Sequence, residues 1–415
     1  MKIYIRSAEN GSTNKQRISI AKRSTDPKEL SQLAHDNSSL VRMAVLQNEY
    51  TPQDTVDQLA REMVNDKSAK VRWAVAEKTN DQNLLTQLAD DEDMNVRWAV
   101  AWKINDSNII TKFAYDPDGP VRLVAARRTD DPDILAKLAD DEDVLVRLVV
   151  VRRTDDPNLL AKFADDEDEQ VRRVVAKKAD DPDILAILAD DDDWQVRAEV
   201  ARKTTDFDIL SKSAYDQDRN VRIAVAMKTK DPDILAKLAD DDDGKVRLSL
   251  AKNTDDLDIL AKLADDKDVS VRRAVAMHTE DSRILAILAD DDDWQVREAV
   301  VNKTDDQNIL TKLANDESWQ VRLLVANKTT DLNLLAKLAD DSDRDVREEV
   351  AWRTDDPYIL TKLADDESWQ VREAVAERTD DLDILAKLAN DEDWHVSSAA
   401  RKRHKSVRPN VITTL

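Results

Sequence analysis

The dipeptide Val-Arg recurs along this 415-residue chain at a constant spacing of 25 residues. The register runs unbroken from Val71 to Val371, and Val396 occupies the next place in it. Upstream, Val41 belongs to the same series after an insertion of five residues, and QRISIAKRSTDP around residue 16 forms one more, degenerate copy. A fixed period of this length is the signature of a repeat architecture, so it constrains the fold more than any local signal does. We count about sixteen repeats.

We number each repeat from its valine, so that residues 121–145 form one complete repeat, VRLVAARRTDDPDILAKLADDEDVL. Its apolar pattern predicts two short amphipathic helices, over 121–128 and 132–139. Asp131 followed by Pro132 is a strong start signal, because aspartate caps the free N–H groups of a helix and proline suits its first turn. The same signal recurs at Asp156, Asp181, Asp231 and Asp356. Helices of about eight residues are unstable alone, so each pair must bury its apolar face against neighbouring pairs.

The run DPDGPVRLVAARR at 116–128 resembles HEAT-type repeats, and the repeat length together with DPDILAKLAD resembles the leucine-rich repeat variant branch of such solenoids. The resemblance covers about residues 16–400. It implies an all-α fold, a right-handed superhelical solenoid of two-helix repeats, and a function in binding other macromolecules. Proteins of the variant family carry a cysteine-rich N-terminal segment for an Fe–S cluster, whereas this chain has no cysteine. The resemblance therefore implies no cofactor for this chain.

We predict three segments along the chain. Residues 1–15 are expected to be flexible, residues 16–400 to form a single solenoid domain, and residues 401–415 to form a basic tail that begins RKRHKSVRP. The repeat at 46–70 is five residues longer than the others. We expect this insertion to lengthen its second helix to about Asn65.

Acidic residues occupy fixed positions in the repeat. Position 21 is aspartate in every copy, for example Asp191 and Asp291, and position 23 is aspartate or serine. Aspartate and serine interchange at helix N-caps, so we predict that the oxygen at position 23 caps the helix that follows. A Ca²⁺ site would use this interchange poorly. The resemblance implies that position 21 pairs with the arginine at position 2 in a ladder between stacked repeats, with Arg197 and Arg297 as rungs.

Composition argues against catalysis and against membrane association. Only four histidines are present, none is paired at ligand spacing, and the chain has neither a glycine-rich phosphate loop nor a nucleophile motif. No apolar run is long enough to span a bilayer and no signal peptide is visible, so we expect a cytoplasmic, non-enzymatic protein. A formal charge of -24 favours basic partners over nucleic acid or anionic lipid.

Binding specificity is expected where solvent-facing positions vary between repeats. Position 24 varies freely, and it supplies our candidate protein-binding residues: Trp194, Trp294, Trp319, Arg344, Trp369 and Trp394. Indole faces beside carboxylates suit Lys- or Arg-rich segments, so one interpretation is a continuous binding ridge. The other interpretation is that each tryptophan only covers the first turn of its own helix and a neighbouring alanine.

A basic pattern provides a second candidate site. Positions 7 and 8 are both cationic in four consecutive repeats, and with one further arginine they form a candidate phosphate-binding strip: Arg127, Arg128, Arg152, Arg153, Arg173, Lys177, Lys178, Arg202 and Lys203. Such a strip suits nucleic acid, although neighbouring aspartates are placed to form local salt bridges with it. The cation at position 8 also lies at a helix C-terminus, where the helix dipole favours it.

The favoured interpretation is a non-catalytic scaffold, inhibitor or adaptor that docks a basic partner protein along the acidic, tryptophan-containing edge. One alternative is a nucleic-acid-binding solenoid that uses the dibasic strip, and another is a purely structural spacer. The identity of the partner and the oligomeric state stay open.

Overall fold

The computed structural model describes residues 13–51 and 53–407, and within these ranges it contains 31 α-helices and no strand. The chain divides into two compact units, residues 1–203 and 204–415, which we call the N-terminal half and the C-terminal half. No described helix combines the length and the apolar content that crossing a bilayer requires.

In the N-terminal half, odd numbers denote the first helix of each repeat and even numbers the second. The odd-numbered helices are α1 (Asn14–Arg23), α3 (Ser39–Leu46), α5 (Ala69–Lys78), α7 (Met94–Lys103), α9 (Gly119–Arg128), α11 (Val144–Arg153), α13 (Glu169–Lys178) and α15 (Trp194–Lys203). The even-numbered helices are α2 (Pro27–Leu33), α4 (Gln53–Met63), α6 (Gln82–Leu88), α8 (Ser107–Phe113), α10 (Pro132–Leu138), α12 (Pro157–Phe163) and α14 (Pro182–Leu188). With 11 residues, α4 is longer than the other even-numbered helices, as the insertion in its repeat predicts.

In the C-terminal half the same alternation continues. The odd-numbered helices are α17 (Arg219–Ala226), α19 (Gly244–Asn253), α21 (Val269–His278), α23 (Trp294–Lys303), α25 (Trp319–Lys328), α27 (Arg344–Arg353), α29 (Trp369–Arg378) and α31 (Trp394–Val407). The even-numbered helices are α16 (Phe207–Ser213), α18 (Pro232–Ala239), α20 (Leu257–Leu263), α22 (Ser282–Leu288), α24 (Gln307–Leu313), α26 (Leu332–Leu338), α28 (Pro357–Leu363) and α30 (Leu382–Leu388). The predicted all-α solenoid of about sixteen two-helix repeats is confirmed.

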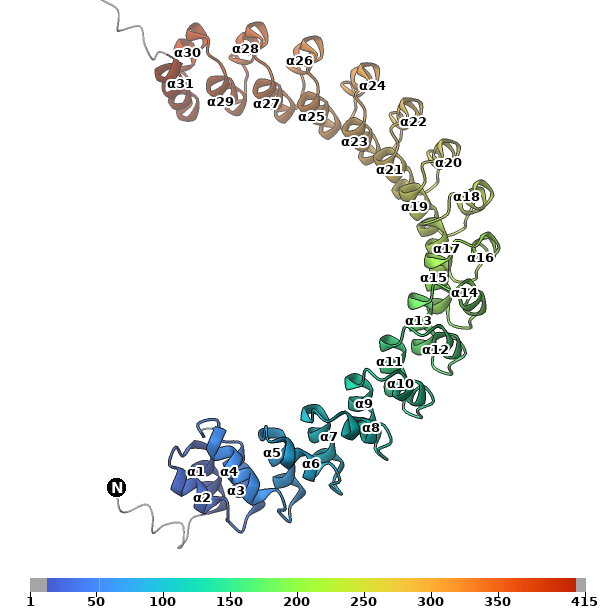
Figure 1. Cartoon of the computed structure of the whole chain (residues 1–415). Helices are drawn as coiled ribbons and strands as arrows, with labels where there is room; N and C mark the ends of the chain where they lie inside the picture. Colours follow the sequence, from blue (N-terminus) through green and yellow to red (C-terminus); the bar gives the residue numbers. More distant parts are fainter. Residues whose placement is uncertain (1–12, 52, 408–415) are drawn as a thin grey trace, which may run out of the picture. The chain divides into compact units, whose positions relative to one another are not determined.

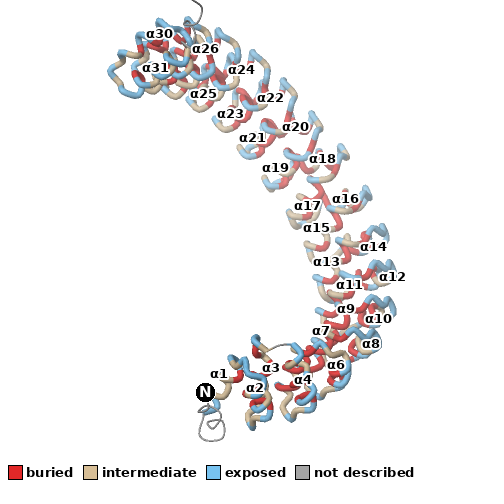
Figure 2. The backbone as a smooth tube through the Cα atoms, turned by 60° about the vertical axis from the view of Figure 1, so that its left-hand side comes forward, coloured by how far each residue is buried: buried red, intermediate tan, exposed pale blue. Residues whose placement is uncertain are grey.

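Within each half the helices form two rows (Figure 1). Consecutive odd-numbered helices pack directly against one another, and the even-numbered helices pack against the odd-numbered helices beside them. Consecutive even-numbered helices have fewer contacts with one another, apart from the pair α18 and α20. Buried residues gather between the two rows (Figure 2). The row of odd-numbered helices is therefore the continuous part of each stack.

The valine at position 1 lies at the centre of this packing. It is fully buried in all fifteen repeats from Val41 to Val396. In the repeat that begins at Val121, Ala125 on α9 and Leu138 on α10 are buried with it. Burying one valine side chain contributes roughly 1.5–3 kcal/mol. Because these short helices are unstable alone, stacking supplies most of their stability.

Aspartate caps behave as predicted at both helices of the repeat. Asp131 accepts a hydrogen bond from the backbone N–H two residues later at 2.9 Å, and the other four Asp-Pro starts have the same cap. Asp293 caps α23 through the N–H of Gln295 at 2.8 Å. The serines at position 23 form no such bond. The hydroxyl of Ser318 donates to Gln320 Oε1 instead, at 2.7 Å, so the predicted equivalence of aspartate and serine at this cap is wrong.

Three predicted boundaries move in the structure. The first helix of the repeat begins at Gly119 and not at residue 121; its N-cap residue, Asp118, forms no side-chain cap bond and accepts Arg97 Nη2 at 2.5 Å instead. Residues 401–407 of the predicted basic tail are helical within α31, since arginine and lysine are good helix formers. At the other end, α1 begins at Asn14, inside the segment predicted to be flexible. The remaining parts of both segments, 1–12 and 408–415, lie outside the described residues.

Candidate functional site

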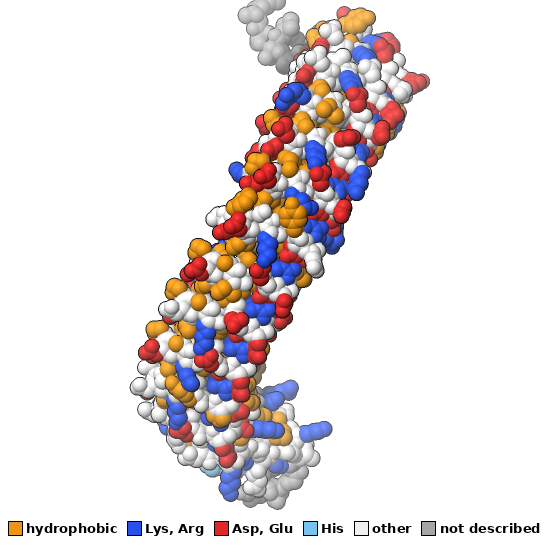
Figure 3. All heavy atoms as spheres, turned by 90° about the vertical axis from the view of Figure 1, so that its right-hand side faces the viewer, with side chains coloured by type: hydrophobic (Ala, Val, Ile, Leu, Met, Phe, Trp, Pro, Cys, Tyr) orange, Lys and Arg blue, Asp and Glu red, His pale blue; other side chains and the backbone are white. Residues whose placement is uncertain are grey.

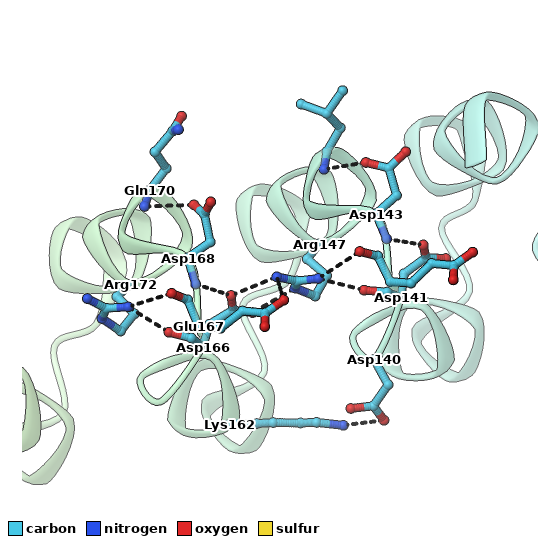
Figure 4. A network of polar contacts seen from close by, with 12 residues as sticks. Asp140, Asp141, Asp143, Arg147, Lys162, Asp166, Glu167, Asp168, Gln170 and Arg172 are labelled. Carbon is cyan, nitrogen blue, oxygen red and sulfur yellow. Dashed lines mark hydrogen bonds and ion pairs between the residues drawn. The ribbon is translucent and has the colours of Figure 1, made fainter.

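The arginine at position 2 contacts the aspartate at position 21 of its own repeat and of the repeat before it. Arg147 on α11 donates from Nε and Nη2 to the two carboxylate oxygens of Asp166, at 2.9 and 3.1 Å (Figure 4). Its Nη1 donates to the backbone oxygen of Asp141 at 2.8 Å. In the C-terminal half, Arg297 contacts Asp316 in the same way at 2.6 and 2.8 Å. The ladder that the family resemblance implies is therefore present: each arginine pairs with the position-21 carboxylate of its own repeat and bonds the backbone oxygen of the position-21 aspartate of the preceding repeat.

The aspartates singled out from the sequence take part in this ladder. Asp191 is held by Arg172 and Asp291 by Arg272, each with a shortest nitrogen–oxygen distance of 2.6 Å. Arg197 donates from Nη1 to the backbone oxygen of Asp191, also at 2.6 Å. The carboxylate of each such aspartate thus receives the arginine of its own repeat, and its carbonyl receives the arginine of the following repeat.

The position-21 carboxylate is fully engaged by these contacts. Asp166 Oδ1 also accepts the backbone N–H of Asp168 at 2.9 Å, and Asp168 caps α13 through the N–H of Gln170 at 2.9 Å (Figure 4). At the equivalent place in the C-terminal half, the Arg372 guanidinium lowers the pKa of Asp391 below its ordinary value. Bidentate, charge-assisted pairs are among the strongest side-chain hydrogen bonds. These aspartates hold the repeats together and leave no free oxygen for a ligand.

The surplus acids beside the ladder are also largely paired within the fold. The lysine at position 17 bridges to the aspartate at position 20 of the preceding repeat, as in Lys162 with Asp140 at 2.6 Å (Figure 4). The glutamate at position 22 reaches the ladder arginine, as in Glu167 with Arg147 at 3.0 Å. On the face that carries the even-numbered helices, basic and acidic side chains are accordingly interspersed (Figure 3). The acids at positions 20 and 22 are therefore less available to a basic partner than their number suggests.

The candidate tryptophans at position 24 each begin an odd-numbered helix. Trp294 and Trp319 are 37% and 38% exposed, so each indole packs against the fold on one side and meets solvent on the other. Trp369 is half-buried, and its ring stacks on His395 with centroids 4.8 Å apart and planes 25° apart. Trp194 begins α15 in the N-terminal half, so the structure does not group it with the others. Each interpretation therefore fits one face of these rings. The buried face covers the fold, and the exposed face is available to a partner.

Trp394 has different surroundings from the other tryptophans. It is 73% exposed, and it borders a shallow hollow on α31 that is lined by Ser398, Arg401, Lys402, Lys405 and Ser406. These cations would repel a basic partner segment. Trp394 is therefore a poor member of a surface that binds basic segments.

Carboxylates lie one helical turn after two of the tryptophans. Positions 24 and 3 are four residues apart and share one helix face, which pairs Trp294 with Glu298 and Trp369 with Glu373. Burial raises the pKa of Glu373, and the nearby Glu377 adds to this effect. Sequence analysis missed these glutamates, although the free variation of position 3 between repeats was a visible signal.

Arg344 occupies the same register on α27 as these tryptophans. Its Nε contacts Asp345 at 3.1 Å, and Glu348 follows it one turn later. Position 24 of this repeat thus presents a cation that is already paired, and the half-buried Glu348 continues the row of position-3 carboxylates.

The position-8 cations of the candidate phosphate-binding strip are used within the fold. Arg128 donates to the backbone oxygen of Ala101 at 2.7 Å. The other three form ion pairs with an acid of the preceding repeat: Arg153 with Asp130 at 2.6 Å, Lys178 with Asp155 at 3.0 Å and Lys203 with Asp180 at 2.9 Å. The local salt bridges expected from the sequence are present. They engage the position-8 cations of the strip and leave only its other residues to be considered for phosphate binding.

The remaining strip residues separate into two groups. Arg173, Lys177 and Arg202 converge on the carboxylate of Glu199, with nitrogen–oxygen distances of 3.8, 3.5 and 3.3 Å. Arg127 and Arg152 form no ion pair with another described residue. Only these two of the strip's cations are available without breaking an ion pair or hydrogen bond seen among the described residues.

Two exposed tryptophans stand next to the first of these free cations. The guanidinium carbon of Arg127 lies 5.9 Å from the centroid of the Trp102 ring. The rings of Trp98 and Trp102 are 6.2 Å apart in an edge-to-face arrangement. Sequence analysis passed over these residues because it searched position 24 alone, whereas they occupy positions 3 and 7.

No protein-family model matches the chain, and no curated protein matches it. Among solved structures, it is similar to a leucine-rich repeat variant with a novel repetitive motif, at 29% identity and a TM-score of 0.45, covering 53% of this chain and 88% of that one. It is similar to a chain from a complex of Kap95p with RanGDP at 12% identity and a TM-score of 0.28, covering 97% and 62%. It is similar to a chain of the S. pombe condensin Cnd3–Cnd2 subcomplex at 12% identity and a TM-score of 0.29, covering 91% of this chain and 64% of that one. This chain spans less than two thirds of the last two.

The repeats themselves identify the type of fold. Two short helices per repeat, a buried valine at position 1 and an arginine–aspartate pair between positions 2 and 21 recur through both halves. The chain is therefore an all-helical repeat protein, an α-solenoid of two-helix repeats.

Proposed function

We propose that the chain is a non-catalytic scaffold that holds a basic segment of a partner protein on its C-terminal half. The docking surface, which we call the tryptophan–glutamate face, comprises Trp294, Trp319, Trp369, Glu298, Glu348 and Glu373. The observation that carries the proposal is the recurrence of a partly exposed indole one helical turn from a carboxylate.

The chemistry of this face suits lysine and arginine. An indole face attracts a cation by about 0.5–1 kcal/mol at an exposed site and by more where water is excluded. A carboxylate one turn away on the same helix can accept a hydrogen bond from that cation. Tryptophan is also enriched among the residues that dominate binding energy at protein interfaces.

The partly buried glutamates favour a bound cation further. Burial raises the pKa of Glu373, because the carboxylate is poorly hydrated and other acids lie nearby. An arginine or lysine placed beside it would favour the charged form, and the same contact would contribute to affinity. The half-buried glutamates can therefore contribute to the affinity for a basic partner, although a count of exposed acids would leave them out.

The repeat spacing predicts the pattern of cations in the partner. Neighbouring packed helices lie about 8–10 Å apart, and an extended peptide advances about 3.3 Å per residue. A segment with a cation at every third residue would meet one repeat after another along α23, α25, α27 and α29.

The test uses a fluorescein-labelled peptide with arginine at every third residue and serine between. We expect the full chain to bind it, and the triple variant Trp294→Ala, Trp319→Ala and Trp369→Ala to bind at least about tenfold more weakly, measured by fluorescence polarisation. Circular dichroism should show unchanged helicity, since each ring is partly exposed.

Two single variants serve as matched controls. Trp194→Ala removes the same residue from the N-terminal half, and Trp394→Ala removes the ring that is bordered by cations on α31. Each should change peptide affinity by less than about twofold. Equal affinity of the triple variant and the unaltered chain would refute the proposal.

A further inference from the structure

We propose a second docking surface, on the N-terminal half, for an acidic and apolar segment of a partner protein. It lies across the neighbouring helices α7, α9 and α11 (Figure 1), and we call it the arginine–tryptophan face. Its members are Trp98, Trp102, Arg127, Leu145 and Arg152. It is separate from the tryptophan–glutamate face and stands independently of it.

The three helices share a charge pattern that other odd-numbered helices, such as α17 and α19, also have. Their sequences are MNVRWAVAWK, GPVRLVAARR and VLVRLVVVRR, and none contains an acidic residue. The chain as a whole has 87 acidic residues and a formal charge of -24. The position-2 arginines of these helices are buried in the ladder, so the exposed charge of the face comes from Arg127 and Arg152.

The aromatic end of the face is already arranged for binding. Trp98 and Trp102 are 39% and 41% exposed, and their rings meet edge to face. Arg127 comes from the following repeat and places its guanidinium over the Trp102 ring. An arginine held against an indole loses less side-chain entropy on pairing with a carboxylate than a freely moving one would.

The other end of the face combines an apolar side chain with a free cation. Leu145 is 54% exposed, and Arg152 is exposed on the same stripe of α11. Neither Arg127 nor Arg152 forms an ion pair with another described residue. An exposed leucine on the same face as two arginines without ion pairs is expected where a partner supplies both apolar area and negative charge.

Charge complementarity identifies the occupant as an acidic protein segment. Arg127 and Arg152 occupy the same position in successive repeats, which places them roughly one helix spacing of 8–10 Å apart. An extended segment covers that distance in about three residues. The expected partner therefore carries Asp or Glu at every third residue, with aliphatic or aromatic residues between them that contact Trp102 and Leu145.

Nucleic acid fits this surface less well than protein. Leu145 offers no planar face on which a base can stack. At the ends of the same helices, Asp130 and Asp155 are paired with the position-8 cations Arg153 and Lys178. These cations cannot bind a phosphate backbone that followed the row without breaking those pairs.

The experiment selects binders from a phage-displayed library of random peptides on the full chain. We expect selected peptides to be enriched in Asp or Glu at every third residue with apolar residues between them. A synthetic copy should bind the double variant Arg127→Gln, Arg152→Gln at least about tenfold more weakly than the unaltered chain. Trp98→Ala, Trp102→Ala should weaken binding to a similar extent.

Controls separate this surface from the others. Arg202→Gln changes a strip cation that is paired with Glu199, and it should alter affinity by less than about twofold. The triple tryptophan variant of the C-terminal half should bind the acidic peptide normally, so failure of one proposal leaves the other intact.

Three results would overturn the inference. They are selection of Lys- or Arg-rich peptides, absence of any enrichment, and selected peptides that bind the double arginine variant as well as the unaltered chain. A duplex or single-stranded DNA oligonucleotide that binds, and whose binding is lost in the double variant, would assign the surface to nucleic acid instead.

Discussion

Helices α11 and α29 occupy the same place in their repeats but present different chemistry to solvent. Both bury the valine at position 1, and both use the arginine at position 2 for the ladder. At the exposed position 7, α11 has Arg152 and α29 has Glu377, while at position 3 the buried Leu148 of α11 corresponds to the half-buried Glu373 of α29. The comparison teaches that fold and surface charge depend on different positions of one repeat.

The same contrast extends to the neighbouring helices. No acid occurs in α7, α9 or α11, whereas α23, α27 and α29 each have a glutamate at position 3. Because the position-2 arginines are paired inside the ladder in both halves, they do not contribute to this difference. We infer that one scaffold offers a surface for acidic segments in one half and a surface for basic segments in the other.

The largest expected effect comes from breaking the feature that both halves share. Asp166→Ala in the N-terminal half and Asp316→Ala in the C-terminal half each leave a buried arginine without its carboxylate. Removing one partner of a buried pair typically costs about 3–5 kcal/mol. We expect losses of that size in the free energy of unfolding, equal in the two halves, measured by urea unfolding followed by circular dichroism.

The glutamate next to each of these aspartates is the matched control. Glu167→Gln and Glu317→Gln change an exposed carboxylate that reaches the same arginine. Exposed ion pairs contribute about 0–1 kcal/mol, so these variants should lose little stability. The ladder would not be what joins the repeats if the aspartate and glutamate variants lost equal stability.

The second-largest effect is expected when the surface charge of the C-terminal half is reversed. In the variant Glu298→Arg, Glu348→Arg and Glu373→Arg, the tryptophan–glutamate face becomes cationic. We expect its affinity for the arginine peptide to fall at least about tenfold, because like charges across an interface are strongly unfavourable. Binding of the acidic peptide to the C-terminal half should increase. Unchanged affinity for the arginine peptide would show that these glutamates do not contact it.

A smaller effect tests the difference between serine and aspartate caps. Ser318 and Ser368 form no cap bond, and their hydroxyls donate to glutamine side chains. Ser318→Asp should form the missing bond and raise the free energy of unfolding by about 0.5–1 kcal/mol. Ser318→Ala should be nearly neutral in the same urea experiment. A loss of about 1 kcal/mol in Ser318→Ala would mean that the hydroxyl does cap α25 in solution.

The smallest expected effect is the pH dependence at Glu373. Its raised pKa means that the folded state binds a proton there more readily than the unfolded state, so this residue adds stability as pH falls through its folded pKa. Glu373→Gln should be at least as stable as the unaltered chain near neutral pH. That advantage should shrink as the pH approaches about 4. A difference that is independent of pH, measured by urea unfolding, would contradict the assignment.

The repeat allowed most of the fold to be predicted from the sequence. A residue such as Val121 has the same neighbours in every repeat, so its burial follows from the period alone, and the Asp-Pro starts follow from local capping chemistry. Ser318 was mispredicted because its hydroxyl has a second local partner in Gln320. The direction of each ladder rung also required coordinates, since it depends on how consecutive repeats stack.

The candidate sites were less predictable because they depend on contacts between different positions. The three cations around Glu199 and the stacking of His395 on Trp369 both join residues of neighbouring repeats. No period in the sequence places these side chains together. Trp98 and Trp102 were visible in the sequence, but they become a candidate site only once Arg127 is seen to lie over one of them.

Every repeat in the ladder pairs its position-2 arginine with its own position-21 aspartate, and it presents the carbonyl of that aspartate to the arginine of the repeat after it. Whole repeats could therefore be reordered without leaving an unmatched charge at a junction, provided that the register is kept. Rearrangement of existing blocks would then move acid-free and glutamate-bearing helices next to one another with no new core to optimise. Variation in such a protein is combinatorial, and selection can act on the order of the blocks as well as on single residues.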